Sequence, residues 1–194
     1  MTKIISGKKL FTIATITVFV TGLMLASTLD EAQAKTNNLK CNNVVGSFSP
    51  PPATSPFLFT SGIGNCTSFG AVSLAGVYAV TGSPSFDCVT LTSVTDTYVL
   101  AKSGDHVMLT APALTQCFTD ATGAPISIAT PFCGVGGIAA STVTGAVTVT
   151  GGLDNGLPIT GGSGTFNSSV NHCAGLSAPF GNSSVTDITG TFTV

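Results

Sequence analysis

Short stretches of β-branched and aromatic residues, separated by Gly, Pro, Asn and Asp, make up most of the chain after residue 68. From Val143 to Thr150, apolar residues alternate with threonine or glycine, which is the two-residue period of a strand with one buried face. The last stretch, 185–194, follows the same period. The pattern predicts nine strands, at residues 69–80, 87–94, 96–101, 105–111, 125–130, 138–150, 157–160, 164–170 and 185–194.

No stretch of about 12 residues has the helical period, and a chain rich in Thr, Ser and Gly forms helices poorly. We therefore expect an all-β fold. Glycine clusters at 134–137, 151–152 and 161–164 suit strongly coiled strands and tight corners. The strand pattern still runs at Val194, and a closed sheet would give this last strand a partner on each side. The prediction is an antiparallel β-barrel of about eight strands, with a Greek-key β-sandwich as the alternative.

The first 34 residues have the features of a secretory signal peptide. Three lysines precede an apolar run of 17 residues at 10–26, and Ala32-Gln33-Ala34 offers the small residues after which a signal peptidase cleaves. We predict cleavage between Ala34 and Lys35 and a secreted product that is extracellular, bound to the cell surface or periplasmic. An uncleaved anchor is the alternative, because a run of this length lies at the lower limit of what crosses a bilayer.

Residues 35–60 lack a clear strand or helix period. The run from Ser49 to Pro56 contains four prolines and favours extended, polyproline-like backbone. We interpret 1–34 as the signal peptide, 35–60 as a Pro-rich N-terminal arm and 61–194 as the barrel domain. The aromatic residues at 57–59 would dock this arm on the domain or begin its first strand.

Charge excludes several classes of function. Charged residues make up 7% of the chain, and all six basic residues are lysines. After residue 34, three lysines face six aspartates, a net charge of −3. Without arginine, this surface cannot neutralise a nucleic-acid backbone or bind a phosphate in the bidentate manner. We therefore expect no nucleic-acid partner, and the charge is too weak to attract a basic partner over distance.

All six cysteines follow the predicted cleavage position, and the even number favours three disulfides in an oxidising compartment. Sequence alone does not choose among the pairings. Our preference is Cys41 with Cys66, which would attach the arm, and Cys117 with Cys133, which would close a short loop. This leaves the pair Cys88 with Cys173. No C-x-x-C pair occurs, so we expect no metal site and no cofactor.

Two pairs of adjacent residues could suggest a catalytic site. Asp105-His106 could form part of a nucleophile relay, but adjacent strand residues point to opposite faces, so a turn residue followed by an ordinary strand residue is the better interpretation. His172-Cys173 could suggest an activated thiolate, although a disulfide is the expected state of Cys173. The segment 154–156, Asp-Asn-Gly, favours a hairpin turn over a calcium site. We predict no catalytic residue.

Two segments together resemble a known family. Residues 103–110 form a Gly-Asp turn leading into a strand, and residues 159–166 read I-T-G-G-S-G-T-F. This resembles the secreted bacterial proteins of the allene oxide cyclase and dirigent barrel superfamily, whose members carry a Gly-Asp turn and a segment like I-T-G-G-T-G-R-F. The resemblance implies an eight-stranded antiparallel barrel with an apolar interior. The resemblance covers about residues 69–194, but the residues that carry it lie in these two segments.

The departures from the family pattern concern function. Thr165 stands where the family has a basic residue, and the segment 167–182, with Cys173 inside it, replaces a short Gly-rich hairpin. Dirigent chemistry in the superfamily involves Asp with Arg or Tyr, and this chain has no Arg. The resemblance thus implies a fold and secretion but no catalytic residue.

These observations favour a secreted, disulfide-stabilised, non-catalytic β-barrel protein with a structural, interaction or small apolar ligand-binding role. Its partner would be a small apolar ligand or another surface protein, without a transmembrane segment in the mature chain. Two alternatives remain: an adhesin-like β-sandwich that binds other proteins, and a barrel enzyme of the cyclase or dirigent type.

Overall fold

The computed structural model describes residues 34–49, 57–81, 85–174 and 183–194. The chain divides into two compact units, Met1–Ala34 and Lys35–Val194, and all described strands belong to the second. The predicted signal peptide, apart from Ala34, and the proline run 50–56 lie outside the described residues. Cleavage between Ala34 and Lys35 therefore stays a prediction.

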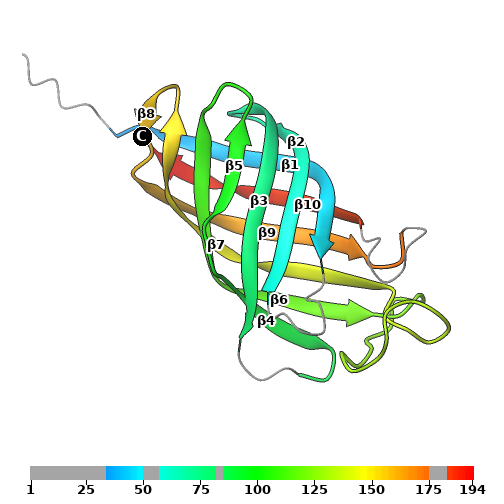
Figure 1. Ribbon diagram of the computed structural model, residues 1–194. Coiled ribbons are helices and arrows are strands. Elements are labelled where there is room, and N and C mark those ends of the chain that lie inside the picture. The colour runs from blue at the N-terminus through cyan, green and yellow to red at the C-terminus, as the bar shows by residue number, and fades with distance from the viewer. Residues whose placement is uncertain (1–33, 50–56, 82–84, 175–182) are drawn as a thin grey trace, which may run out of the picture. The chain divides into compact units, whose positions relative to one another are not determined.

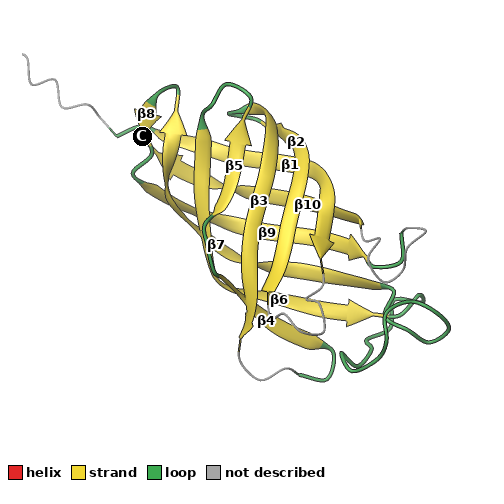
Figure 2. Ribbon diagram, in the orientation of Figure 1, coloured by secondary structure: helices red, strands yellow, loops and turns green. Residues whose placement is uncertain are grey.

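Every regular element in the described residues is a strand, so the all-β prediction is confirmed (Figure 2). The ten strands are β1 (Thr36–Ser49), β2 (Phe57–Cys66), β3 (Gly70–Thr81), β4 (Cys88–Ser93), β5 (Thr97–Ala101), β6 (His106–Thr119), β7 (Ala140–Asp154), β8 (Leu157–Pro158), β9 (Gly161–Asn171) and β10 (Ser183–Thr193).

The antiparallel ladders close on themselves in a ring of eight strand positions (Figure 1). Each long strand pairs with the next along the chain, and β10 returns to pair with β1 as well as with β9. β4 and β5 both pair with β3 and with β6, so together they fill one position of the ring. Closure gives the last strand partners on both sides, as the sequence predicts.

The interruption between β4 and β5 faces a bulge in β6. Pro112, which lacks a backbone N–H, lies in this bulge, where the register with β7 shifts between Thr110 and Ala113. Side chains replace the missing ladder bonds. The Ala111 N–H donates to the Ser93 hydroxyl at 2.9 Å, and the Thr110 hydroxyl donates to the Asp96 carboxylate.

Aromatic rings fill the interior of the ring of strands. The Tyr78 ring lies 5.9 Å from that of Phe48 and 6.3 Å from that of Phe166, and the Phe69 and Phe192 rings stack at 5.5 Å. Burial raises the pKa of Tyr78 to about 12, so its phenol stays protonated; it shares a hydrogen bond of 2.6 Å with the Thr97 hydroxyl.

Glycines of β9 allow close strand approach, since a Cβ at Gly162 or Gly164 would lie 2.1 or 2.4 Å from a carbonyl oxygen of β10.

The predicted arm at 35–60 is wrong as a structural unit, because β1 and the start of β2 lie within it. β1 buries Leu39, Cys41, Val44 and Phe48, and a register shift at residues 42–44 interrupts its two-residue period. Asn43, with φ 52°, belongs to this irregularity. Because of this bulge, the apolar residues of β1 do not alternate regularly with polar ones, so the sequence pattern does not predict the strand. The domain begins at Lys35 rather than at 61.

The strand predicted at 125–130 is also wrong. Only an isolated bridge, Thr119 to Pro125, occurs there, and the loop of residues 120–139 is held mainly by turns. The Asp120 carboxylate accepts hydrogen bonds from the Thr122 hydroxyl and from backbone N–H groups, and these bonds lower the pKa of Asp120. The start of this loop is therefore held by hydrogen bonds to the Asp120 side chain rather than by strand pairing.

Candidate binding groove and buried polar network

A row of directly opposed residues crosses the outer face of the ring. Val45 of β1 opposes Ile63 of β2, Ile63 opposes Ser73 of β3, and Ser73 opposes Leu100 of β5. The exposed fractions are 55% for Val45, 72% for Ile63 and 46% for Leu100. Large apolar side chains at this exposure, side by side on one sheet, are unusual unless something covers them. We name this surface of β1, β2, β3 and β5 the apolar face.

A groove with a volume of about 720 Å³ runs over the apolar face. Small outward residues of β3, Ala71 and Ser73, lie in it between the bulkier Ile63 on one side and Leu100 on the other. The groove therefore follows from a difference in side-chain size between neighbouring strands. Its volume lies within the range of small-molecule sites. Its lining is Val45, Ile63, Gly64, Asn65, Ala71, Val72, Ser73, Leu100, Ala101 and Lys102.

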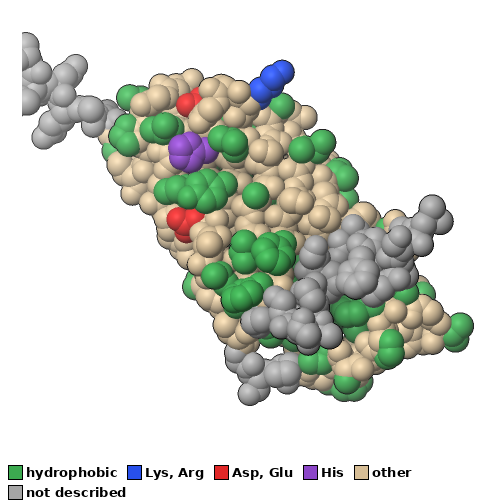
Figure 3. Space-filling view, viewed as in Figure 1, with side chains coloured by type: hydrophobic (Ala, Val, Ile, Leu, Met, Phe, Trp, Pro, Cys, Tyr) green, Lys and Arg blue, Asp and Glu red, His purple; other side chains and the backbone are tan. Residues whose placement is uncertain are grey.

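In the space-filling view, this side of the molecule carries scattered hydrophobic side chains among uncharged polar ones, with few charged groups (Figure 3). The groove lining contains a single charged residue, Lys102, in the turn that follows β5. The Lys102 backbone N–H donates to the Ala71 carbonyl at 3.1 Å, which fixes the start of this turn against β3. The groove is thus apolar along its walls and cationic at one position.

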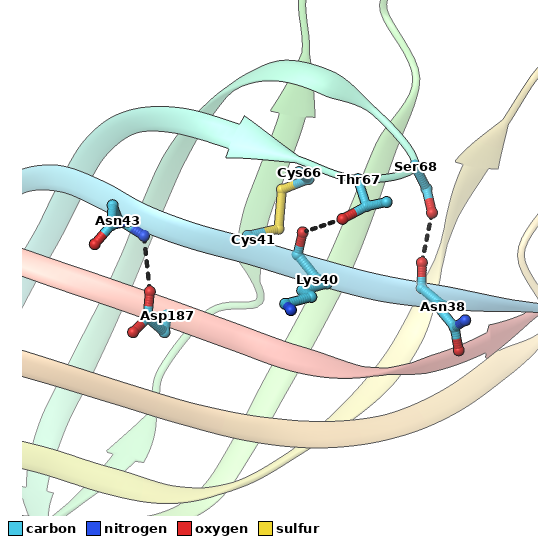
Figure 4. The surroundings of a disulfide bond; sticks show 8 residues. All are labelled: Asn38, Lys40, Cys41, Asn43, Cys66, Thr67, Ser68 and Asp187. Carbon is cyan, nitrogen blue, oxygen red and sulfur yellow. Dashed lines mark hydrogen bonds between the residues drawn. A yellow bond between two sulfur atoms is a disulfide. The ribbon is translucent and has the colours of Figure 1, made fainter.

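The disulfide between Cys41 and Cys66 joins β1 to β2 beside the groove (Figure 4). The two cysteines oppose each other in the ladder, with their Cα atoms 3.9 Å apart. Two hydrogen bonds from Thr67, at 2.8 and 3.2 Å, reach the Lys40 carbonyl, and the Asp187 carboxylate of β10 accepts the Asn43 N–H at 2.7 Å. These contacts fix the bulged strand from which Val45 projects.

All six cysteines are in disulfides, and the pair Cys41–Cys66 is as predicted. The other two predicted pairs are wrong. Cys88 bonds to Cys117, because the two oppose each other in the ladder between β4 and β6. Cys133 bonds to Cys173 and ties the loop 120–139 to the segment after β9. The sequence prediction paired Cys117 with Cys133, whereas the strand register places Cys117 of β6 opposite Cys88 of β4. Three disulfides indicate an oxidising, extracytoplasmic environment.

A second candidate site is a buried polar network that the sequence analysis missed. Gln116 Nε2 donates to the Ser141 hydroxyl at 3.0 Å, and Ser141 Oγ lies 2.8 Å from His172 Nε2. Ser141 Oγ accepts from Gln116, and its contact with His172 Nε2 joins the imidazole to the same network. Gln116 interrupts the inward apolar series of β6 between Leu114 and Phe118, which is the sequence signal that could have found it.

A serine hydroxyl within hydrogen-bond distance of an imidazole is the arrangement of a nucleophile and its base. Here, however, Ser141 is 2% exposed and His172 0% exposed. The rings of Phe118 and Phe132 lie 5.9 and 4.9 Å from the imidazole. Burial lowers the pKa of His172 to about 4, so the ring is neutral at pH 7. The network therefore links β6, β7 and the end of β9 in the interior rather than facing a substrate.

The residues singled out in the sequence take structural positions. Asp105 accepts from the Ser103 hydroxyl at 3.1 Å and from the Gly156 N–H at 3.3 Å, so it joins two turns. His106 lies at the start of β6, with its ring 6.4 Å from that of Tyr98. Asp154 accepts from the Asn37 amide at 2.8 Å, and residues 155–156 form the two-residue turn between β7 and β8. Cys173 is in a disulfide.

Within the described residues, no three His, Cys, Asp or Glu side chains lie together as metal ligands. In the same part of the chain, no helix is long and apolar enough to cross a bilayer. The chain matches no family model, no curated protein and no solved structure. The function is therefore inferred from the residues of this chain.

Proposed function

We propose that the protein is a secreted, disulfide-stabilised binding protein without catalytic activity, and that it takes small apolar ligands in the groove on its apolar face. The observation that carries this proposal is the outward row of Val45, Ile63 and Leu100 with the groove beside it. Predicted signal-peptide cleavage at Ala34–Lys35 and the three disulfides support secretion.

The interior is the other place where an eight-stranded closed sheet could hold a ligand. The stacked rings of Phe48, Tyr78 and Phe166 occupy it, and each of these residues is at most 1% exposed. A ligand would have to displace close-packed side chains there, whereas the outer groove needs only the removal of water. This difference favours the outer face. The resemblance to the allene oxide cyclase and dirigent barrels stays a prediction.

The exposed apolar residues are not explained by folding. Val45 and Leu100 lie on strands whose inward residues already contact the core, such as Val44 beside Val45 and Val99 beside Leu100. Threonine or serine at the outward positions would keep the strand period and cost little stability. Retaining large apolar side chains there instead supports a surface that binds.

The test is binding of the uncharged fluorescent dye Nile red to the oxidised protein recovered from a secreting host. We expect saturable binding that falls at least fivefold in the Ile63→Thr variant, because Ile63 forms one wall of the groove. The matched control is Leu157→Thr, which removes a 56%-exposed apolar side chain outside the groove. Equal loss in both variants, or no saturable binding by the unmodified protein, would overturn the proposal.

A further inference from the structure

The groove lacks free backbone hydrogen-bonding groups on its central strand. β3 pairs with β2 along residues 70–79 and with β5 along residues 72–75, so its N–H and C=O groups in the groove are in ladders. A peptide laid in the groove would leave its own amides without partners there, which costs binding free energy. An alkyl chain has no such groups and matches walls made of Val45, Ile63 and Leu100.

The one charged residue of the lining gives the groove a direction. Lys102 follows β5 at the end of the groove where its N–H bonds to Ala71. Among the described residues, no carboxylate forms an ion pair with Lys102. The nearest acid along the chain, Asp105, is hydrogen-bonded to Ser103 and Gly156 instead. An exposed ammonium with no carboxylate partner among the described residues, at the end of an apolar groove, complements a negative group attached to an apolar chain.

We infer that the ligand is a single-chain anionic amphiphile, whose alkyl chain lies along β3 between Ile63 and Leu100 and whose head group meets Lys102. The inference rests on the proposed function and adds the chemical class of the ligand. The apolar walls supply most of the affinity through the area that they remove from water, and Lys102 supplies the preference for a negative head group.

The test compares three probes that share a ten-carbon chain: decanoate, decanol and decyltrimethylammonium. Each is titrated below its micelle concentration, at pH 8 and low salt, against the oxidised secreted protein. Calorimetry gives the affinity, and methyl NMR signals of Ile63 and Leu100 locate the site. We expect decanoate to bind most tightly and decyltrimethylammonium most weakly. The Lys102→Met variant, which keeps an apolar stem, should lose about fivefold in affinity for decanoate and change little for decanol.

The matched control is Lys40→Met, which removes another exposed lysine that does not line the groove. It should leave the affinity for decanoate unchanged. The preference for decanoate over decanol should also shrink as salt screens the charge. If decanol and decanoate bind equally well in the groove and Lys102→Met changes neither, the head-group inference is wrong and the proposed function stands. If no probe shifts the Ile63 and Leu100 signals, both are wrong.

Discussion

The ring of strands has two contrasting outer surfaces. The apolar face, over β1, β2, β3 and β5, exposes Val45, Ile63 and Leu100. The outward positions of β7, β9 and the C-terminal half of β10 instead carry mainly hydroxyl groups, a surface that we name the hydroxyl face. In one of its cross-strand pairs, Thr165 and Thr189 share a hydrogen bond of 2.9 Å. The main members are Thr142, Thr144, Thr148, Thr150, Ser163, Thr165, Ser169, Thr189 and Thr191.

Both faces cover the same core. Behind the hydroxyl face, β9 and β10 bury Phe166 and Ile188, and behind the apolar face, β2 and β3 bury Leu58 and Leu74. The inward residues therefore meet similar demands, and folding does not explain why only one outer surface is apolar. The hydroxyl face shows that strands of this protein can cover the same core while exposing mainly hydroxyl-bearing side chains. The apolar face departs from that pattern, and this departure is the physical basis for assigning a binding role to it.

The largest expected effect tests whether the two faces share one core. Phe166→Ala behind the hydroxyl face should lower the free energy of unfolding by about 3–5 kcal/mol, and Leu74→Ala behind the apolar face by about 2–5 kcal/mol. The outward neighbours Thr165→Ala and Ser73→Ala should each change it by less than about 0.5 kcal/mol. Urea unfolding of the oxidised protein measures all four. A large loss in Thr165→Ala would mean that the hydroxyl face is part of a buried interface.

The contrast between inward and outward positions could be predicted from the sequence, and the binding groove could not. The period of two residues in 143–150 and 185–194 marks β7 and β10 directly. The strand period did not predict β1, because the bulge at residues 42–44 shifts the alternation of inward and outward residues. The proline run that follows β1 favoured the interpretation of this segment as an arm. One extra residue is enough to conceal a strand, since it exchanges the two faces of the part of the strand that follows it.

The groove depends on which strands become neighbours. Ile63, Ser73 and Leu100 are far apart in sequence, and only the register of β2, β3 and β5 places them in one row. The same holds for Cys88 and Cys117, and for Ser141 and His172, which meet across strands or at their ends. The sequence pattern predicts whether a strand residue points inward or outward. To predict a site, one must also know which residues lie opposite each other on neighbouring strands.

A smaller effect concerns acid stability behind the hydroxyl face, where Ser141 of β7 meets His172. Burial lowers the pKa of His172 to about 4, against about 6.5 for an unperturbed histidine. Between these values the unfolded chain binds a proton that the folded protein does not, so stability falls as the pH drops from about 6.5 to about 4. The full loss is about 3 kcal/mol, measured by urea unfolding at a series of pH values.

Two variants separate His172 from other titrating groups. His172→Phe keeps an aromatic ring beside Phe118 and Phe132 and should remove the slope in this pH range. His106→Phe, at an outward position on β6, should retain it. Asp120, whose pKa is lowered by its loop hydrogen bonds, stabilises the fold above the usual aspartate pKa and loses this contribution only below it. Its effect therefore falls outside the window of His172. An unchanged slope in His172→Phe would show that the imidazole does not control acid stability.

The smallest expected change in stability comes from exchanging residue types between the two faces. Ile63→Thr and Thr165→Val should each alter the free energy of unfolding by less than about 0.5 kcal/mol, because both positions are exposed strand positions. Their effects on Nile red binding should nevertheless differ. Ile63→Thr removes a wall of the groove on the apolar face, whereas Thr165→Val adds one apolar side chain to the hydroxyl face, where Thr165 does not line that groove. If Thr165→Val created binding comparable to that of the unmodified protein, exposed apolar area alone would explain the signal, and the arrangement of small residues between large ones on β2, β3 and β5 would have no special role.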